Sequence, residues 1–289
     1  MDQEIMNTKE EEKGKRIAVV TGASSGLGRE LVHLLDTTWN TKIDEIYVIA
    51  RRRENLEKIR EETGLPVRVL AYDLTKEEDI EKIEGILKDE SPDVRLLINA
   101  AGFGKIGRYD EIPRAQIDRM IDLNCRAAVD MTQICLPYMS EGSRVMEICS
   151  TAAFQPFQYL NVYAASKSFL YRYSRALRVE LLPKKILVTA VCPYWIKNTE
   201  FIDTAEQTDP KADRIRSFPF SMKVEDIAVR ALADTELGLA VSTPGPVCTL
   251  HRFFAKLIPA DLMMGLFEGI RRIPPAGRKT HQGSYTSVR

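Results

Sequence analysis

TGASSGLG, at residues 21–28, separates an apolar run at 16–21 from a segment of helical periodicity that begins at Gly26. A glycine-rich turn between a strand and a helix is typical of folds that hold a pyrophosphate. Gly22 allows a tight exit from the strand, Gly26 allows a phosphate to approach the helix N-terminus, and Gly28 allows close helix packing. The alternative is a tight turn whose glycines serve packing alone. The position of the turn favours dinucleotide binding.

Apolar runs of strand length alternate with helix-period segments along most of the chain. This alternation predicts an α/β fold, a doubly wound Rossmann sheet of mostly parallel strands with helices on both faces. The predicted strands are 16–21, 45–50, 68–72, 95–99, 143–150, 187–192 and 239–242, and the predicted helices are 26–35, 54–62, 76–88, 114–138, 162–182 and 224–237.

The pattern also predicts how the 289 residues are organised. A polar leader, 1–14, precedes a dinucleotide-binding and catalytic domain, 15–245. An apolar helical extension, 246–273, and a flexible tail, 274–289, follow it. Within the domain, 194–221 lacks a clear period, and a loop of that length is usually a lid or a binding segment.

Charge is balanced, because Lys+Arg and Asp+Glu number 41 each. Such a chain has no global field that attracts nucleic acid or an anionic membrane, so any charged ligand must be recognised locally. The five cysteines are scattered without CxxC spacing, which disfavours a disulfide framework and a metal site. No run approaches the roughly 20 apolar residues of a membrane span, and the first residues do not resemble a signal peptide. We therefore expect a cytoplasmic protein without a metal.

The residues after the second predicted strand indicate which dinucleotide is bound. An NAD site of this architecture would place an acidic residue there, but the sequence has Arg51 and Arg52. Guanidinium groups suit a 2′-phosphate, which favours NADP(H), although exposed basic turns are also common. Asp73, after the third strand, is either a residue of a helix N-cap region or an acceptor for the adenine amine.

Tyr163 and Lys167 lie one turn apart on a predicted helix, so they project from one face. A free phenol has a pKa near 10, and we expect the adjacent ammonium and a cationic nicotinamide to lower it. The spacing alone arises often by chance. Its position, directly after the fifth strand, favours a catalytic role.

Two further polar residues accompany this pair. Ser150 ends the fifth strand at the carboxyl edge of the sheet, where its hydroxyl can bond a substrate carbonyl or simply cap a turn. Asn124 is a poor helix former inside a predicted helix. It is either a satisfied buried amide or a kink that holds a water for proton relay.

Together these motifs resemble the short-chain dehydrogenase/reductase family over about residues 15–242. The similar features are TGASSGLG, the Asp73-Leu74 pair, Asn99-Ala100-Ala101-Gly102 in place of NNAG, Asn124, Ser150 and Tyr163-Ala-Ala-Ser-Lys167, in family order. The resemblance implies about seven parallel strands and a catalytic tetrad of Asn124, Ser150, Tyr163 and Lys167. The cofactor-binding residues that it implies are Gly22, Ser24, Ser25, Gly26, Leu27, Gly28, Arg51, Arg52, Asp73, Leu74, Asn99, Ala101, Gly102, Tyr163, Lys167, Ile196 and Thr199.

Three positions depart from the family pattern. Ala100 replaces the second Asn of NNAG, while the first, Asn99, which is expected to support the adenosine side, remains. Tyr194 replaces the Gly that usually follows the proline after the sixth strand, which affects the expected carboxamide contacts of Ile196 and Thr199. Ser25 stands where many NADP-dependent members have a basic residue, leaving the 2′-phosphate to the two arginines.

The expected substrate walls, 152–162 and 194–220, are rich in aromatic residues and favour an apolar carbonyl or alcohol. We expect hydride transfer between NADP(H) and a ketone or secondary alcohol, steroid-like or a keto-lipid. The alternatives are a 3-oxoacyl thioester reductase and a non-catalytic NADP-binding regulator.

Three helical segments are expected to contact other parts of the molecule or other subunits. Helices 114–138 and 162–182 are expected to form a homodimer or homotetramer. The segment 253–273 is expected to pack over the substrate cleft or a neighbouring subunit, in preference to lying on a membrane.

Overall fold

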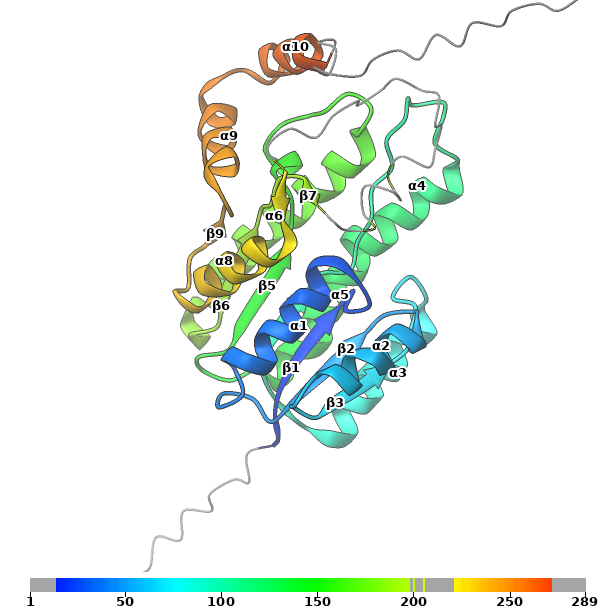
Figure 1. The fold of residues 1–289 in the computed structure, drawn as a ribbon, viewed down its shortest axis with the longest axis vertical. Coiled ribbons are helices and arrows are strands. Elements are labelled where there is room, and N and C mark those ends of the chain that lie inside the picture. Colours follow the sequence, from blue (N-terminus) through cyan, green and yellow to red (C-terminus); the bar gives the residue numbers. More distant parts are fainter. Residues whose placement is uncertain (1–13, 198–199, 201–204, 206–220, 272–289) are drawn as a thin grey trace, which may run out of the picture.

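The computed structural model describes residues 14–197, 200, 205 and 221–271. Its main sheet has seven strands, all parallel, in the order β3-β2-β1-β4-β5-β6-β9 (Figure 1). The strand order reverses between β1 and β4, where doubly wound folds open a crevice at the carboxyl edge. The strands are β1 (Arg16–Thr21), β2 (Glu45–Ile49), β3 (Val67–Leu70), β4 (Asp93–Asn99), β5 (Arg144–Ile148), β6 (Leu187–Val191) and β9 (Val241–Ser242).

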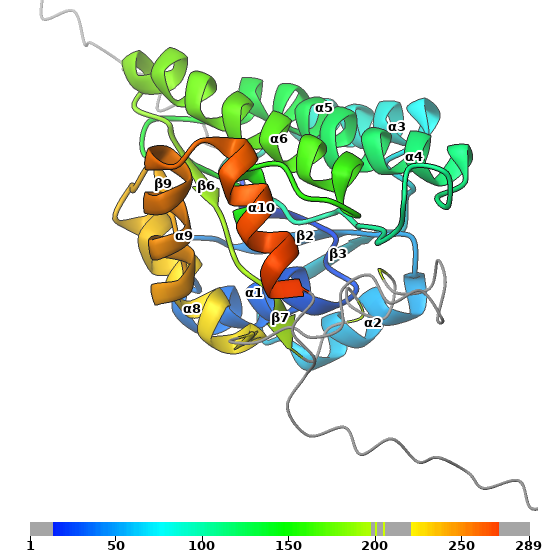
Figure 2. The same cartoon turned by 90° about the horizontal axis from the view of Figure 1, so that it is seen from above.

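Helices cover both faces of the sheet (Figure 2). One face carries α1 (Gly26–Thr38), α2 (Arg53–Glu62) and α8 (Val224–Glu236), and the other carries α3 (Glu77–Glu90), α4 (Arg114–Ile121), α5 (Ala127–Cys135) and α6 (Asn161–Leu181). Alternate residues of β1 serve the two cores: Ala18 and Val20 pack with the first group, Ile17 and Val19 with the second. The strands are buried on both faces, which is why they read as continuous apolar runs.

The predicted fold class is confirmed, and residues 114–138 are helical as predicted, although not uniformly α-helical. Helix α4 continues into a π-helical turn, Asp122–Arg126, then into α5 and a 3₁₀ turn, Leu136–Tyr138. The π turn coincides with Asn124, whose side chain bonds the backbone of Phe103 outside the helix. The two-stranded pair of β7 (Ile196–Lys197) and β8 (Met222–Lys223) was not predicted.

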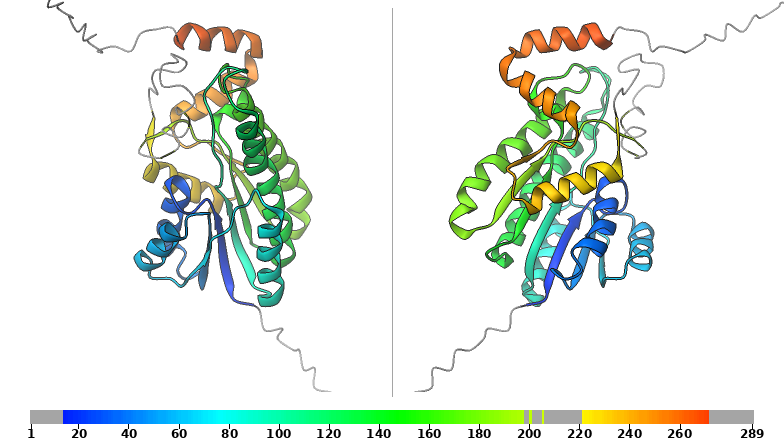
Figure 3. Two further views of the ribbon diagram at one scale, coloured as in Figure 1. Left: turned by 90° about the vertical axis from the view of Figure 1, so that its right-hand side faces the viewer. Right: turned by 60° about the vertical axis from the view of Figure 1, so that its left-hand side comes forward.

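The chain beyond β9 forms α9 (Pro246–Leu257) and α10 (Ala260–Arg271). Gly245 has a φ of 93°, which favours glycine, and Pro246 then starts α9 at a position where its missing N–H costs nothing. Figures 1 and 3 show these helices at the end of the molecule opposite the start of β1. No helix among the described residues is both long and apolar enough to cross a membrane. The predicted leader up to residue 13 and the predicted tail lie outside the described residues.

Candidate active site

A cavity of about 1090 Å³ opens at the carboxyl edge of the sheet. Its walls come from the turn after β1, the ends of β2, β4 and β5, helix α6, and the C-terminal helices α9 and α10. The cavity therefore lies where the strand order reverses, at the position at which this architecture binds ligands. It joins the glycine-rich turn and the Tyr163–Lys167 pair in one space.

The glycine-rich turn is shaped by contacts that only glycine permits. Gly22 has a φ of 66°, and a Cβ there would lie 2.7 Å from the backbone nitrogen of Ala101. A Cβ on Gly28 would lie 2.4 Å from the carbonyl oxygen of Gly22, so the first turn of α1 packs directly on the loop. Six predicted turn residues line the cavity: Gly22, Ser24, Ser25, Gly26, Leu27 and Gly28.

Two arginines line the cavity beside this turn. Arg51 and Arg52 follow β2, and Arg52 donates to the Ser24 hydroxyl at 3.2 Å. Arg52 also binds both carboxylate oxygens of Glu200 at 2.9 Å. The hydrogen bond from Arg52 is the main reason that the pKa of Glu200 lies below its usual value, and Ser25 contributes a further hydrogen bond. Glu200 is a site residue that the sequence did not reveal.

Asp73 and Leu74, which follow β3, also line the cavity. The Asp73 carboxylate accepts from the Thr75 backbone N–H at 3.1 Å and hydroxyl at 2.8 Å, and it faces Arg119 at 3.2 Å. Burial opposes ionisation of Asp73, but these hydrogen bonds and the Arg119 charge outweigh it and hold the pKa below the usual value. Asp73 thus organises its own turn as well as bordering the cavity.

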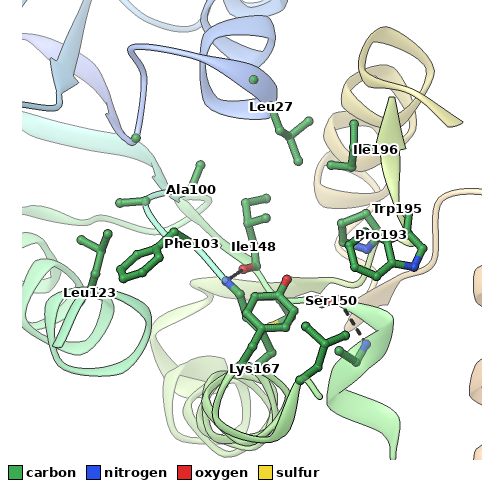
Figure 4. A pocket seen from close by; sticks show the side chains of 18 of the residues that line it. Leu27, Ala100, Phe103, Leu123, Ile148, Ser150, Lys167, Pro193, Trp195 and Ile196 are labelled. Carbon is green, nitrogen blue, oxygen red and sulfur yellow. Dashed lines mark hydrogen bonds between the residues drawn. The ribbon is translucent and has the colours of Figure 1, made fainter. Parts of the chain in front are cut away.

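Ser150, Tyr163 and Lys167 meet in the cavity. The Ser150 hydroxyl follows β5, accepts from the Ala152 backbone N–H at 3.1 Å, and hydrogen-bonds to Tyr163. The ammonium of Lys167 reaches from α6 and donates to the Ile148 carbonyl oxygen at 2.7 Å (Figure 4). The backbone at the end of β5 therefore holds the Lys167 ammonium, and the turn that follows holds the Ser150 hydroxyl.

Burial controls the acidity of this group of residues. It raises the pKa of Tyr163 to about 12, and the hydrogen bond with Ser150 offsets only part of that rise. Burial also lowers the pKa of Lys167. In the chain alone, desolvation thus outweighs the effect of the neighbouring ammonium, and the expected lowering of the phenol pKa by the ammonium together with a cationic nicotinamide stays a prediction. At neutral pH the phenol is protonated and can act as an acid.

Two predicted site residues lie outside the cavity lining. Asn124 is fully buried, accepts from the Phe103 N–H at 3.0 Å, and donates to the Phe103 carbonyl at 2.9 Å and the Ser166 hydroxyl at 3.0 Å. Its side chain pins the loop after β4. Asn99 donates to the Ala128 carbonyl, the Thr132 hydroxyl and Glu147, so its side chain ties β4 to α5 and β5. A cofactor contact by the Asn99 side chain is not supported.

Most of the remaining predicted cofactor-binding residues line the same cavity. Ala101, Gly102 and Ile196 line it, as does Tyr194, which replaces the usual glycine. Thr199 lies outside the described residues. Arg51, Arg52, Tyr163 and Lys167 share the space with them, so most of the predicted cofactor set is brought together.

The substrate end is apolar. Phe157 and Trp195 from the predicted walls line it, and so do residues of the segment 253–273, which was expected to pack over the substrate cleft or a neighbouring subunit. The His251 ring nitrogen pairs with Gln155 at 2.9 Å, and burial lowers its pKa. The lining side chains from α9, α10 and the link between them are Val247, His251, Phe254, Ile258, Met263, Leu266 and Phe267.

This fold and these side chains define the class of dinucleotide-dependent oxidoreductases. Residues 16–210 match the family model for short chain dehydrogenases, and the chain belongs to that family.

Several curated proteins and one solved structure are informative relatives. A very-long-chain 3-oxoacyl-CoA reductase of Anas platyrhynchos is 29% identical over 86% of this chain and 78% of its own length. A sulfoacetaldehyde reductase of Chromohalobacter salexigens is 30% identical over 72% of this chain and 83% of its own length. A short-chain dehydrogenase from Sphingobium yanoikuyae, solved in complex with NADPH, is 25% identical with a TM-score of 0.70, covering 92% of this chain and 99% of its own.

Proposed function

We propose that this oxidoreductase uses NADPH to reduce an apolar ketone, a steroid-like or keto-lipid carbonyl. The observation that carries the proposal is the single cavity, which joins a phosphate-binding turn, a Ser150–Tyr163–Lys167 group and a long apolar wall. A site of this composition binds a mostly apolar ligand and orients it through few polar groups.

The cavity fits NADP(H). A side chain at Gly22 would collide with the backbone, so the loop is built for close approach, and the N-terminus of α1 faces the same space. Arg51 and Arg52 are placed to bind a 2′-phosphate, and guanidinium groups bind phosphate bidentately. An NADP-dependent 3-hydroxy acid dehydrogenase of Escherichia coli, 28% identical over 73% of this chain, and the NADPH complex from Sphingobium yanoikuyae support this choice.

When bound, NADPH supplies the hydride that the ketone carbon accepts. The chain's own groups handle the oxygen. The Ser150 hydroxyl donates a hydrogen bond to the carbonyl and orients it, and the Tyr163 phenol donates its proton to the developing alkoxide. Lys167, which lines the same cavity, places a positive charge there that stabilises the phenolate that remains. Asn124 takes no proton in this scheme and positions the Phe103 loop.

The experiment is a panel assay on the purified full chain. We expect NADPH consumption with a ketosteroid or a long-chain ketone, and little with small polar aldehydes of equal concentration. Tyr163→Phe is the control for non-enzymatic loss of NADPH. Turnover confined to small polar aldehydes would overturn the substrate proposal while leaving the cofactor proposal standing.

A second candidate is the reduction of a 3-oxoacyl thioester. It is favoured by the similarity to the very-long-chain 3-oxoacyl-CoA reductase, which extends over 86% of this chain. Adding a 3-oxoacyl-CoA to the same panel separates the two candidate functions. The proposed chemistry at the carbonyl is the same for both, so a preference for one substrate reports how the rest of the molecule is bound.

We also propose a homodimer or homotetramer formed through α4, α5 and α6. Four large apolar side chains are exposed on or next to these helices, and such residues favour an interface. Light scattering on the purified protein tests the assembly. The side chains are Ile121, Phe169, Val179 and Leu182.

A further inference from the structure

The C-terminal helices carry an exposed apolar surface that adjoins the one lining the cavity and shares Phe254 and Leu266 with it. We call it the outer face, and its members are large hydrophobic side chains that are 45% to 65% exposed. Patches of this kind mark interaction sites. The outer face consists of Leu250 (56%), Phe253 (57%), Phe254 (45%), Leu257 (65%), Leu262 (58%) and Leu266 (51%).

The two surfaces lie on different sides of the same helices. In α9, Val247, His251 and Phe254 line the cavity at helical spacing. Leu250, Phe253 and Leu257 each precede a cavity-lining residue of this segment by one position. They therefore form a neighbouring stripe along the helix that does not line the cavity.

Helix α10 is held to the body through its inner side. The rings of Phe157 and Phe267 meet edge to face with centroids 5.0 Å apart, and Gln158 donates to the Met264 carbonyl at 3.2 Å. Because these contacts fix the orientation of α10, Leu262 cannot turn inward without breaking them. The outer face is thus a property of the folded extension.

Charge identifies the occupant. From 246 to 270 the extension is balanced, with Arg252 and Lys256 against Asp261 and Glu268. The sequence from 271 to 289 contains five cations and no acidic residue. The five cations are Arg271, Arg272, Arg278, Lys279 and Arg289.

We propose that the outer face docks on an anionic phospholipid bilayer. Its leucines and phenylalanines enter the interface, and the basic segment after α10 adds attraction to the headgroups. Apolar insertion combined with a basic segment gives stable, reversible binding, whereas each alone is marginal. The two helices are too short to span and lie in the plane of the surface.

Docking has a consequence for the cavity. Phe254 and Leu266 belong both to the outer face and to the cavity lining, so the cavity borders the docked surface. A ketone dissolved in the bilayer would reach the cavity along these side chains. This consequence rests on the proposed function, whereas docking itself does not.

Vesicle sedimentation of the full chain tests docking without any substrate. The protein should sediment with vesicles of phosphatidylcholine and phosphatidylglycerol, less with phosphatidylcholine alone, and less again as salt is raised. Leu257→Ser with Leu262→Ser, one change in each helix, should lower the partition coefficient at least about tenfold. Neither residue lines the cavity, so the double variant should keep its NADPH-dependent activity on a dispersed ketone.

The matched control is Val229→Ser with Leu237→Ser, which removes apolar side chains of similar exposure (56% and 75%) from the region of α8. This control should sediment like the unmodified protein. Equal sedimentation of the Leu257/Leu262 variant, or failure of the unmodified protein to sediment with anionic vesicles, would overturn the proposal. So would an oligomer that dissociates in the Leu257/Leu262 variant while vesicle binding is absent, because a second copy would then cover the outer face.

Discussion

The guanidinium of Arg52 binds both carboxylate oxygens of Glu200 at 2.9 Å. Glu200 is far from the glycine-rich turn in sequence but close to it in space. Arg52 also donates to Ser24 of that turn, and Ser25 forms a hydrogen bond with Glu200. The carboxylate therefore takes the donors that a cofactor 2′-phosphate would use. Both side chains are about half exposed, so the pair contributes little stability and a phosphate can replace it.

Glu200→Gln should raise the affinity for NADPH by up to about fivefold, because an exposed ion pair is worth at most about 1 kcal/mol. The affinity for NADH should stay the same, since NADH brings no 2′-phosphate to compete. Fluorescence titration with both cofactors measures the two constants. Arg52→Ala is the complementary variant and should lower the affinity for NADPH but not the affinity for NADH. An equal loss of affinity for NADH would contradict this role of Arg52.

Tyr163→Phe removes the proposed proton donor and leaves the ring in place. We expect kcat for ketone reduction to fall by about 100-fold or more, which is the usual contribution of a positioned acid. NADPH binding should persist, as judged by titration. Tyr109→Phe, at a side chain that is 81% exposed, is the matched control and should be silent. Retained turnover in Tyr163→Phe would remove the phenol from the mechanism.

The pH profile of reduction follows from the pKa of Tyr163, which burial raises to about 12. The phenol is already protonated at neutral pH, so the acid form needed for reduction is fully present. We expect kcat/KM for ketone reduction to stay flat between about pH 6 and about pH 9 with respect to this group. A loss of activity centred near neutrality that disappears in the Tyr163→Phe background would show that the phenol ionises there.

Glu147 lies fully buried beneath the site, and burial raises its pKa to about 7. In the unfolded chain the carboxyl ionises near its usual pKa of about 4.3. Between these values the folded protein holds a proton that the unfolded chain has lost, so the free energy of unfolding falls as pH rises. The total fall approaches about 4 kcal/mol and is complete above about pH 7.

Glu147→Gln should remove this pH dependence, since the amide oxygen can still accept from Asn99 and Thr132. Urea unfolding at pH 5 and pH 8 measures the effect, and the variant should gain relative to the unmodified protein at the higher pH only. The conservative change separates charge from packing: a variant that is less stable at both pH values would indicate that hydrogen bonding, and not ionisation, dominates.

Sequence patterns were sufficient where the determining contacts are local. The spacing of Tyr163 and Lys167 places both on one helical face whatever surrounds them. Strand runs such as 16–21 are apolar throughout because both faces of the sheet are covered. The glycines of the turn report a backbone conformation, and the structure gives Gly22 and Gly26 positive φ angles.

Patterns failed where direction or distance in space decided the outcome. Asn99 ends a strand at the correct edge, but the pleat turns its side chain toward Thr132 and Glu147 and away from the cavity. The predicted helix widens to a π turn at Asn124, whose amide bonds a loop 21 residues earlier, and the helical period alone does not reveal this contact. Glu200 carries no sequence signal, since its role depends on meeting Arg52 across the fold.

By itself, the sequence of this protein determined a doubly wound sheet and the presence of Ser150, Tyr163 and Lys167 at its carboxyl edge, because periodicity and glycine placement act over a few residues. Only the tertiary structure decided the acidity of Tyr163, the pairing of Arg52 with Glu200, and the position of α9 and α10 over the cavity with an apolar face left outside. Each of these depends on burial or on contacts between distant segments, which no local pattern encodes.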